Sequence, residues 1–284
     1  MKTSHKILIS VMVIIGVFIL TGNGFTFSKV LRIKDGEVIG FEQMLQEIKG
    51  NRIILIGETH DNPEHHENQL QIVKALDDEN IPVAIGLEMF RADNQPVLDD
   101  WVSMKLTPEE FIGIYYNNWG MPWPLYQDIF LFARKKGIPL IGLNVPKEIT
   151  DRVAKYGFTA LTQEEMGQLP PGISCDVDAT YMKFIKRVYL AHSYAANKEF
   201  TSFCEAQMVW DTAMAWHTLK FLENRPENTA VILAGVGHAW KRAIPERIKR
   251  LNGGHNFTVI LPEIPHRTER GKISPEDADF LILE

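Results

Sequence analysis

The chain has 284 residues, of which 45% are hydrophobic and 23% are charged. This composition is typical of a globular protein, and it excludes a disordered chain, a collagen-like repeat and a small scaffold held by disulfides. The length suggests one large domain, or one domain with a substantial insertion. A net charge of −6 argues against nucleic acid as a partner, because binding to phosphates needs a basic face.

The first 28 residues have the pattern of an export signal. Two lysines precede the apolar run Ile7–Leu20, and small polar residues follow it. The run is short for a hydrocarbon core of about 30 Å, although an extension to Phe27 is just long enough for an anchor. We therefore expect residues 1–28 to be a signal peptide or an N-terminal membrane anchor. Residues 29–284 are then exported, either periplasmic or membrane-anchored and facing outside the cytoplasm.

Five short apolar runs have the character of buried strands. They are rich in Ile, Val and Leu and nearly continuous rather than alternating, which is typical of strands covered on both faces. Helical segments lie between them, so the pattern favours an α/β fold with a mostly parallel sheet flanked by helices. The predicted strands are Arg52–Ile56, Val83–Leu87, Pro139–Leu143, Ala230–Ala234 and Phe257–Leu261.

The predicted helices follow from capping signals and apolar spacing. Thr107 and Glu110, for example, form a capping box that starts a helix. The interval 146–228 is too long for a simple crossover and has no strand pattern, so we interpret it as an inserted helical subdomain. The predicted helices are Asn62–Leu76, Thr107–Ile114, Leu125–Lys136, Pro146–Lys155, Ala179–Ala191, Phe200–Leu222 and Ile244–Lys249.

Polar residues follow four of the predicted strands. Because the carboxyl ends of parallel strands meet at one edge of a sheet, side chains from distant parts of the chain converge there. We expect these residues to line one pocket. They are Glu58, His60 and Asp61 after the first strand, Glu88 after the second, Asn144 after the third and His238 after the fourth.

Imidazoles and carboxylates in one pocket have three interpretations. His60, Glu88 and His238 could be the ligands of a divalent metal ion. They could instead perform general acid–base chemistry in a hydrolase, with one imidazole acting as the base towards water. The third interpretation is a buried network that only braces the strand ends. We favour a functional pocket, because buried charge without a use lowers stability.

One predicted helix carries three further pocket candidates. Gln207, Asp211 and Met214 are spaced by four and three residues and therefore share one face of the helix. We expect this face to reach the pocket, where Asp211 would orient His60 or His238.

Other residues are expected to have no direct part in the pocket. Cys175 and Cys204 could pair outside the cytoplasm, but we expect them to be reduced bystanders. His65 and His66 are expected on the surface, because adjacent helical positions do not face one way. The aromatic segment Tyr115–Pro124 is either the rim of a ligand site or a hinge.

Several of these segments together resemble the ChaN-like family of haem-binding proteins. The resemblance extends from about Asp35 to Leu261 and implies an exported protein that binds haem, takes part in haem or iron uptake at the cell envelope, and dimerises around haem. Many members are lipoproteins, whereas residues 1–30 contain no cysteine. The segments are Gly57–Pro63, Gly86–Phe90, Asn144 with Pro146, Cys204–Ala215 and Ala234–His238.

A wider superfamily is similar to the paired motifs Gly57–His60 and Gly235–His238. It includes the erythromycin esterases and the Tiki and TraB proteins, in which such histidines serve hydrolysis or metal binding. The resemblance therefore keeps a hydrolase, with or without a divalent metal ion, as the alternative function.

The predicted helix from Ala179 onward offers candidates for haem binding. Haem needs an apolar slot, an axial ligand such as a phenolate or an imidazole, and usually basic groups near its propionates. Lysines lie between the aromatic residues of this segment. The alternative is that these rings sit at the margin of the core with their polar ends in water. The candidates are Tyr181, Tyr189, His192 and Tyr194.

Overall fold

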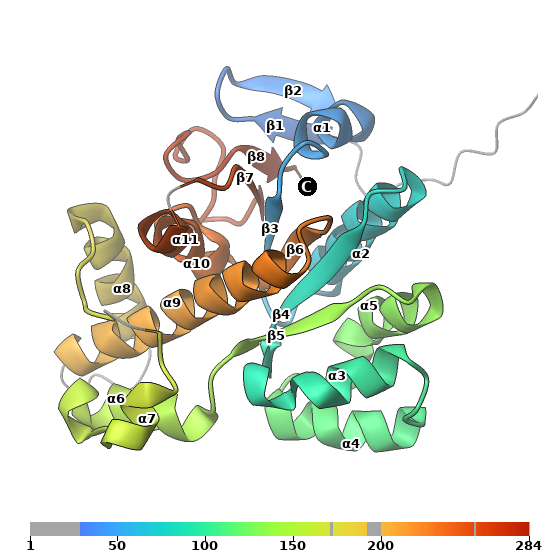
Figure 1. The fold of residues 1–284 in the computed structure, drawn as a ribbon. Helices are drawn as coiled ribbons and strands as arrows, with labels where there is room; N and C mark the ends of the chain where they lie inside the picture. Colours follow the sequence, from blue (N-terminus) through green and yellow to red (C-terminus); the bar gives the residue numbers. More distant parts are fainter. Residues whose placement is uncertain (1–28, 171–172, 192–199, 253, 284) are drawn as a thin grey trace, which may run out of the picture.

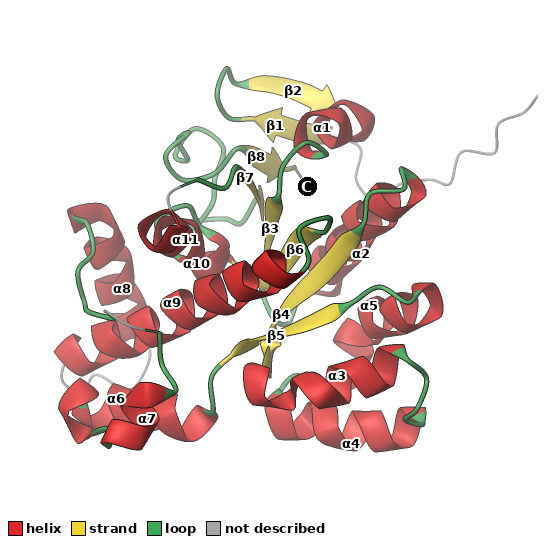
Figure 2. Cartoon of the chain, viewed as in Figure 1, coloured by secondary structure: helices red, strands yellow, loops and turns green. Residues whose placement is uncertain are grey.

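The computed structural model describes residues 29–170, 173–191, 200–252 and 254–283, and these form an α/β fold around one sheet of eight strands (Figure 1, Figure 2). Residues 1–28, for which the sequence predicts a signal or anchor, lie outside the described residues. Within the described residues no helix has the length and apolar character needed to cross a membrane. The strands are β1 (Lys29–Arg32), β2 (Glu37–Gly40), β3 (Ile53–Glu58), β4 (Val83–Arg91), β5 (Leu140–Asn144), β6 (Thr229–Gly235), β7 (Phe257–Pro262) and β8 (Phe280–Ile282).

The sheet is mostly parallel, as the sequence predicts. Its strand order is β2-β1-β8-β7-β3-β6-β4-β5, and neighbouring strands run parallel from β8 to β5. All five predicted strands are present. The sequence did not reveal β1, β2 and β8, because these strands are only three or four residues long. The β1–β2 hairpin closes one edge with antiparallel pairing.

Each central strand contributes alternate side chains to two apolar cores. One core contains Ile54 and Ile56 of β3, and the other contains Ile53 and Leu55. This alternation explains the nearly continuous apolar runs. The first face is covered by α1 (Phe41–Ile48), α2 (Pro63–Asp78), α3 (Gln95–Val102), α4 (Pro108–Asn118) and α5 (Trp123–Lys136), and the second by α9 (Phe200–Asn224), α10 (Val236–Ala239) and α11 (Ile244–Asn252).

The interval 146–228 is helical where the structure describes it. It contains α6 (Lys147–Tyr156), α7 (Gln163–Gly167) and α8 (Ala179–Ala191), and the whole of the long helix α9 follows within it. In Figure 1 these helices gather around the first half of α9, while its second half crosses the sheet. Thus α9 connects the helical insert with the sheet domain.

The two cysteines form a disulfide, so the expectation of reduced bystanders was wrong. Cys204 lies on α9 and is fully buried, and Cys175 lies in the segment before α8. Their Cα atoms are 5.8 Å apart although 29 residues separate them in sequence. The pairing depends on how α9 packs, because this packing places Cys204 next to the start of α8. The spacing of the two cysteines in the sequence does not show this.

The chain reverses its direction across the sheet next to β6. It runs from β3 outward to β4 and β5, returns to β6 between β3 and β4, and continues to β7 on the other side of β3. Such a reversal opens a crevice at the carboxyl ends of the strands. In β4 the register against β5 shifts between Leu87 and Arg91, and Glu88 lies in this irregular stretch. Gly142 permits the irregularity, because a Cβ there would collide with the carbonyl oxygen of Arg91.

Candidate functional site

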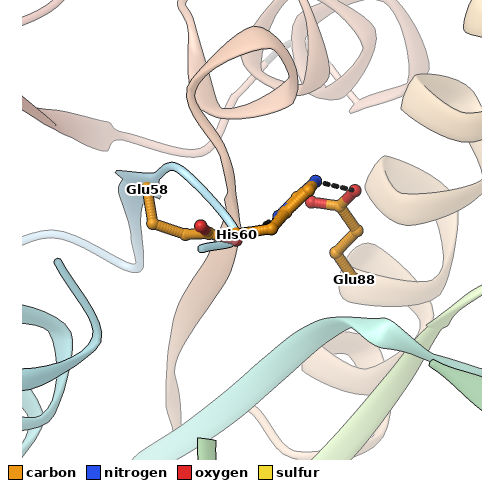
Figure 3. Close-up of side chains that lie close together, drawn as sticks. All are labelled: Glu58, His60 and Glu88. Atoms are coloured by element: carbon orange, nitrogen blue, oxygen red, sulfur yellow. Dashed lines mark hydrogen bonds and ion pairs between the residues drawn. The ribbon is translucent and has the colours of Figure 1, made fainter. Parts of the chain in front are cut away.

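The first half of the site follows the end of β3. Glu58 is the last residue of β3, and its side chain is 1% exposed. His60 donates its Nδ1 hydrogen to Glu58 Oε1 at 2.6 Å, and the hydroxyl of Tyr126 on α5 donates to the same oxygen at 3.3 Å. Figure 3 shows the His60 ring between Glu58 and Glu88. We call Tyr126, Glu58 and His60 the His60 relay.

The loop that carries His60 is braced by residues that the sequence placed on the surface. His65 and His66 are only 4% and 3% exposed, so that expectation was wrong. The backbone N–H of Thr59 donates to His65 Nδ1 at 3.0 Å, and the His66 ring lies 4.1 Å from that of Tyr126. Because α2 begins at Pro63, directly after the loop, its first turn lies against the loop, and both rings turn inward.

The second half of the site joins three elements of distant sequence. His238 lies on α10, just after β6, and its Nδ1 hydrogen is donated to Asp211 Oδ1 at 2.7 Å. Asp211, on α9, is fully buried. Its other oxygen, Oδ2, accepts a hydrogen bond from the hydroxyl of Tyr181 on α8. We call Tyr181, Asp211 and His238 the His238 relay.

Both relays are directed at Glu88. Glu88 Oε1 lies 4.0 Å from His60 Nε2 and 3.8 Å from His238 Nε2. The backbone N–H of Gly235 donates to Glu88 Oε2 at 2.6 Å, and the Asn144 side chain donates to the Glu88 carbonyl at 3.0 Å. Position 235 must be small, because a Cβ there would lie 3.0 Å from His60 Cε1. We call this group of two relays around Glu88 the crevice.

The crevice favours protonated imidazoles. Burial lowers the pKa of His60, but the hydrogen bond that His60 donates to Glu58 and the negative charge of Glu88 outweigh burial and raise the pKa to about 9. Burial also opposes charge on His238, whereas Glu88 and Asp211 raise its pKa above the ordinary value. Burial and the charge of Asp211 raise the pKa of Tyr181, which therefore stays a hydrogen-bond donor.

The crevice residues also fit a divalent transition metal ion. Glu58, His60 and Glu88 each offer a ligand atom, and these atoms lie within 4.8 Å of one another. The separations of 3.8 and 4.0 Å between the Nε2 atoms and Glu88 Oε1 exceed hydrogen-bond distances. They suit two ligands of one ion, each about 2.1 Å from it. Glu58 Oε2 is buried with no hydrogen-bond partner among the described residues.

The remaining pocket candidates divide between the crevice and its surroundings. Asn144 is half-buried and holds the backbone of Glu88. Asp61 is exposed and acts on His60 only through its charge. Gln207 is half-buried one turn before Asp211. Met214 is fully buried in the apolar core between α9 and the sheet. Several neighbouring residues of α9 are apolar, and the sequence does not show which of them faces the sheet.

Two aromatic residues complete the site. The ring of Trp119 meets that of His60 edge-on at 5.0 Å, so the segment Tyr115–Pro124 does border the crevice. Tyr126 was missed, because nothing in its local sequence distinguishes it from a core residue; only the fold brings α5 beside the end of β3.

The haem candidates on α8 have different surroundings. Tyr181 is 1% exposed and its hydroxyl donates to Asp211, so its assignment as a haem ligand was wrong. The half-buried ring of Tyr189 packs against Phe200 and Phe203 at 5.5 and 5.6 Å. His192 and Tyr194 lie outside the described residues.

The end of α8 fits the chemistry of haem. Leu190 is 64% exposed beside Tyr189, and two lysines of the same helix, Lys183 and Lys186, are exposed. Aromatic and aliphatic groups suit a porphyrin face, a phenol suits its iron, and cations suit its propionates. The described residues therefore provide each of these three elements.

Fold and site together define an α/β protein with an imidazole–carboxylate crevice at the point where its sheet changes direction. The chain belongs to the family described as haem-binding uptake, Tiki superfamily, ChaN, which matches residues 44–248. This family is the one that the sequence motifs resemble. No curated protein matches the chain.

One solved structure shares this fold, and a second is less similar. The structure described as cofacial haem binding to ChaN of Campylobacter jejuni has 21% identity and a TM-score of 0.70, covering 90% of this chain and 96% of its own. An erythromycin esterase variant, EreC in its open conformation, has 12% identity and a TM-score of 0.49, covering 85% and 78%. At these identities the first match shows a common fold, and the second carries no argument.

Proposed function

We propose that this protein binds haem and handles haem or iron outside the cytoplasmic membrane. The observation that carries this proposal is membership of the haem-binding family over residues 44–248. The solved ChaN of C. jejuni is described with cofacial haem, that is, haem groups face to face. By analogy this chain forms a homodimer around its haem and exchanges it with uptake components of the cell envelope.

Two features support export. Residues 1–28 combine two lysines, an apolar run and a small polar exit, as signal peptides and anchors do. The disulfide Cys175–Cys204 is also typical of an oxidising compartment, since disulfides are rare in the cytoplasm. Fractionation of cells that produce the full chain tests this part; recovery of the protein with its thiols reduced in the cytoplasm would refute it.

The end of α8 and the residues after it form the proposed haem site. Tyr189, His192 and Tyr194 are the candidate axial ligands, and the exposed lysines of α8 would be available to pair with the propionates. When bound, the haem iron supplies a redox-active centre that takes one phenolate or imidazole ligand from the protein.

Haem titration of the purified full chain tests the site. A Soret band with saturating stoichiometry is expected for the wild type, and one of Tyr189→Phe, His192→Ala and Tyr194→Phe should shift it. Tyr116→Phe is the control, because this exposed tyrosine lies on α4. If all three variants keep the wild-type Soret band, the haem site does not lie on α8. The absence of any Soret band in the wild type would overturn haem binding itself.

A second function is favoured by one observation, the convergence of His60 and His238 on Glu88. In a hydrolase, His60 would act as the base towards water after losing its Nε2 proton, which its pKa of about 9 places at alkaline pH. Glu58 would hold its Nδ1 side, and Glu88 would orient the water. His238 would stabilise the negative charge that develops. A divalent ion held by Glu58, His60 and Glu88, whose ligand atoms lie within 4.8 Å of one another, would supply Lewis acidity there.

Metal content and esterase activity test the second function. The full chain is purified without chelators, its metals are quantified, and p-nitrophenyl esters are offered as probes. His60→Ala combined with His238→Ala should abolish both signals while the fold persists, because both rings lie beyond strand ends. If the wild type contains no metal and shows no turnover, this function is rejected. Haem binding is unaffected by that result.

A further inference from the structure

Tyr181 belongs to the helical insert, yet its ring is built into the wall of the crevice. Asp178, just before α8, accepts the backbone N–H of Tyr181 at 2.7 Å. The ring packs against Phe184 at 6.0 Å and Trp240 at 5.9 Å, and the residue is 1% exposed. These apolar contacts hold the ring in place without help from its hydroxyl.

The hydroxyl of Tyr181 has a separate task, since it donates to Asp211 Oδ2. The other oxygen of this fully buried carboxylate accepts the Nδ1 hydrogen of His238 at 2.7 Å. Among the described residues each oxygen of Asp211 has one donor, and together they hold the carboxylate in a single orientation. A carboxylate with only one donor can turn about its last side-chain bond, and the ring that it holds can turn with it.

Contacts outside the crevice determine where α8 lies. Phe184 sits directly on α10, because a Cβ at Gly237 would lie 2.9 Å from its ring. The start of α8 is attached to α9 by the disulfide Cys175–Cys204, and Arg242 forms an ion pair with Asp178. The hydroxyl of Tyr181 is therefore delivered to Asp211 by the insert as a whole.

We propose that Tyr181 is a positioning residue of the crevice: its hydroxyl fixes Asp211, and Asp211 in turn keeps His238 Nε2 facing Glu88. The insert then does more than carry haem candidates, because it completes a site at the sheet edge. The proposal concerns the crevice of the second function proposed above, but it requires neither a bound metal ion nor hydrolysis.

The His60 relay provides a matched control. Tyr126 donates to Glu58 at 3.3 Å, on the same oxygen that binds His60. Glu58 Oε2 has no partner among the described residues, so Tyr126 does not fix both ends of its carboxylate. Loss of the Tyr126 hydroxyl should therefore disturb His60 less than loss of the Tyr181 hydroxyl disturbs His238.

Proton NMR of the full chain with ¹⁵N-labelled histidine tests the proposal. A downfield His238 Nδ1 proton that exchanges slowly with water is expected, assigned by its disappearance in His238→Gln. Tyr181→Phe should speed this exchange at least tenfold and leave the His60 proton unchanged, whereas Tyr126→Phe should act weakly and only on His60. An unchanged His238 proton in folded Tyr181→Phe would make Tyr181 a packing residue only and overturn the proposal.

A second substitution decides the matter even where Tyr181→Phe does not fold. 3-Fluorotyrosine at position 181 keeps the ring and is a stronger donor, so it should draw charge from Asp211 and move the His238 Nδ1 proton upfield. The same residue at position 189 should not move it. Equal shifts from both positions, or none from position 181, would overturn the proposal. Both measurements use the protein without haem or metal, so they stand apart from the haem and metal tests.

Discussion

The two relays of the crevice share one design and differ in exposure. Each is a phenol, a buried carboxylate and an imidazole, and each points its Nε2 at Glu88. His60 is 39% exposed, however, while His238 is 15% exposed. Both oxygens of Asp211 have donors, whereas Glu58 Oε2 has none among the described residues. The difference supports the proposal that His60, as the more exposed imidazole, would contact a ligand of the crevice, and that the His238 relay would be its fixed support.

The largest effect should come from the carboxylate of the fixed relay. Asp211→Asn places an amide where two donors point, which leaves a buried donor without an acceptor and removes the negative charge beside His238. We expect the free energy of unfolding to fall by about 3 to 5 kcal/mol. Glu58→Gln is the matched change in the His60 relay and should cost about 1 kcal/mol. Urea denaturation measures both, and equal losses would contradict the distinction between the relays.

The disulfide should stabilise only the side of the molecule that contains the His238 relay. It closes a loop between Cys175 and Cys204 that contains α8. Replacing both cysteines with serine should lower the free energy of unfolding by about 3 kcal/mol, because the unfolded chain gains freedom.

Proteolysis locates the effect of losing the disulfide. The variant should be cut near α8 before β3 or α2 become accessible, as judged by mass spectrometry of early fragments. Simultaneous cleavage throughout the chain would show that the disulfide stabilises both relays alike.

Two glycines allow each relay to be disturbed separately. Gly237→Ala brings a methyl group against Phe184 and should push α8 away from His238, at about 2 kcal/mol. Gly235→Ala brings a methyl group against His60, whose exposed ring can move, so about 1 kcal/mol is expected. Histidine NMR spectra should show the His238 signals shifted in Gly237→Ala and the His60 signals shifted in Gly235→Ala. The reverse pattern would contradict the conclusion that α8 supports His238 and that Gly235 makes room for His60.

The sequence predicted most of the sheet and one half of the crevice. Continuous apolar runs identify the central strands, and polar residues at their ends predicted the meeting of His60, Glu88 and His238, which the structure brings together. The His60 relay is largely local, with Glu58 two residues away. Two partners were not predicted: Tyr181 on α8 was assigned to haem and Tyr126 on α5 was missed. They contact their carboxylates across 30 and 68 residues. Such contacts depend on how helices pack, and no local pattern records them.

The pH dependence of stability separates the relays by charge. The folded pKa of His60 is about 9, above its unfolded value of about 6.5. Its proton therefore stabilises the fold fully below pH of about 6.5, and this contribution is lost as pH rises through about 9. Because solvent screens a ring that is 39% exposed, we expect a loss of about 1 to 2 kcal/mol between these pH values. Urea denaturation in the presence of a chelator should show this decline, and His60→Gln should flatten much of it. A decline that persists unchanged in His60→Gln would assign the titrating proton to the His238 relay and refute its description as a fixed support.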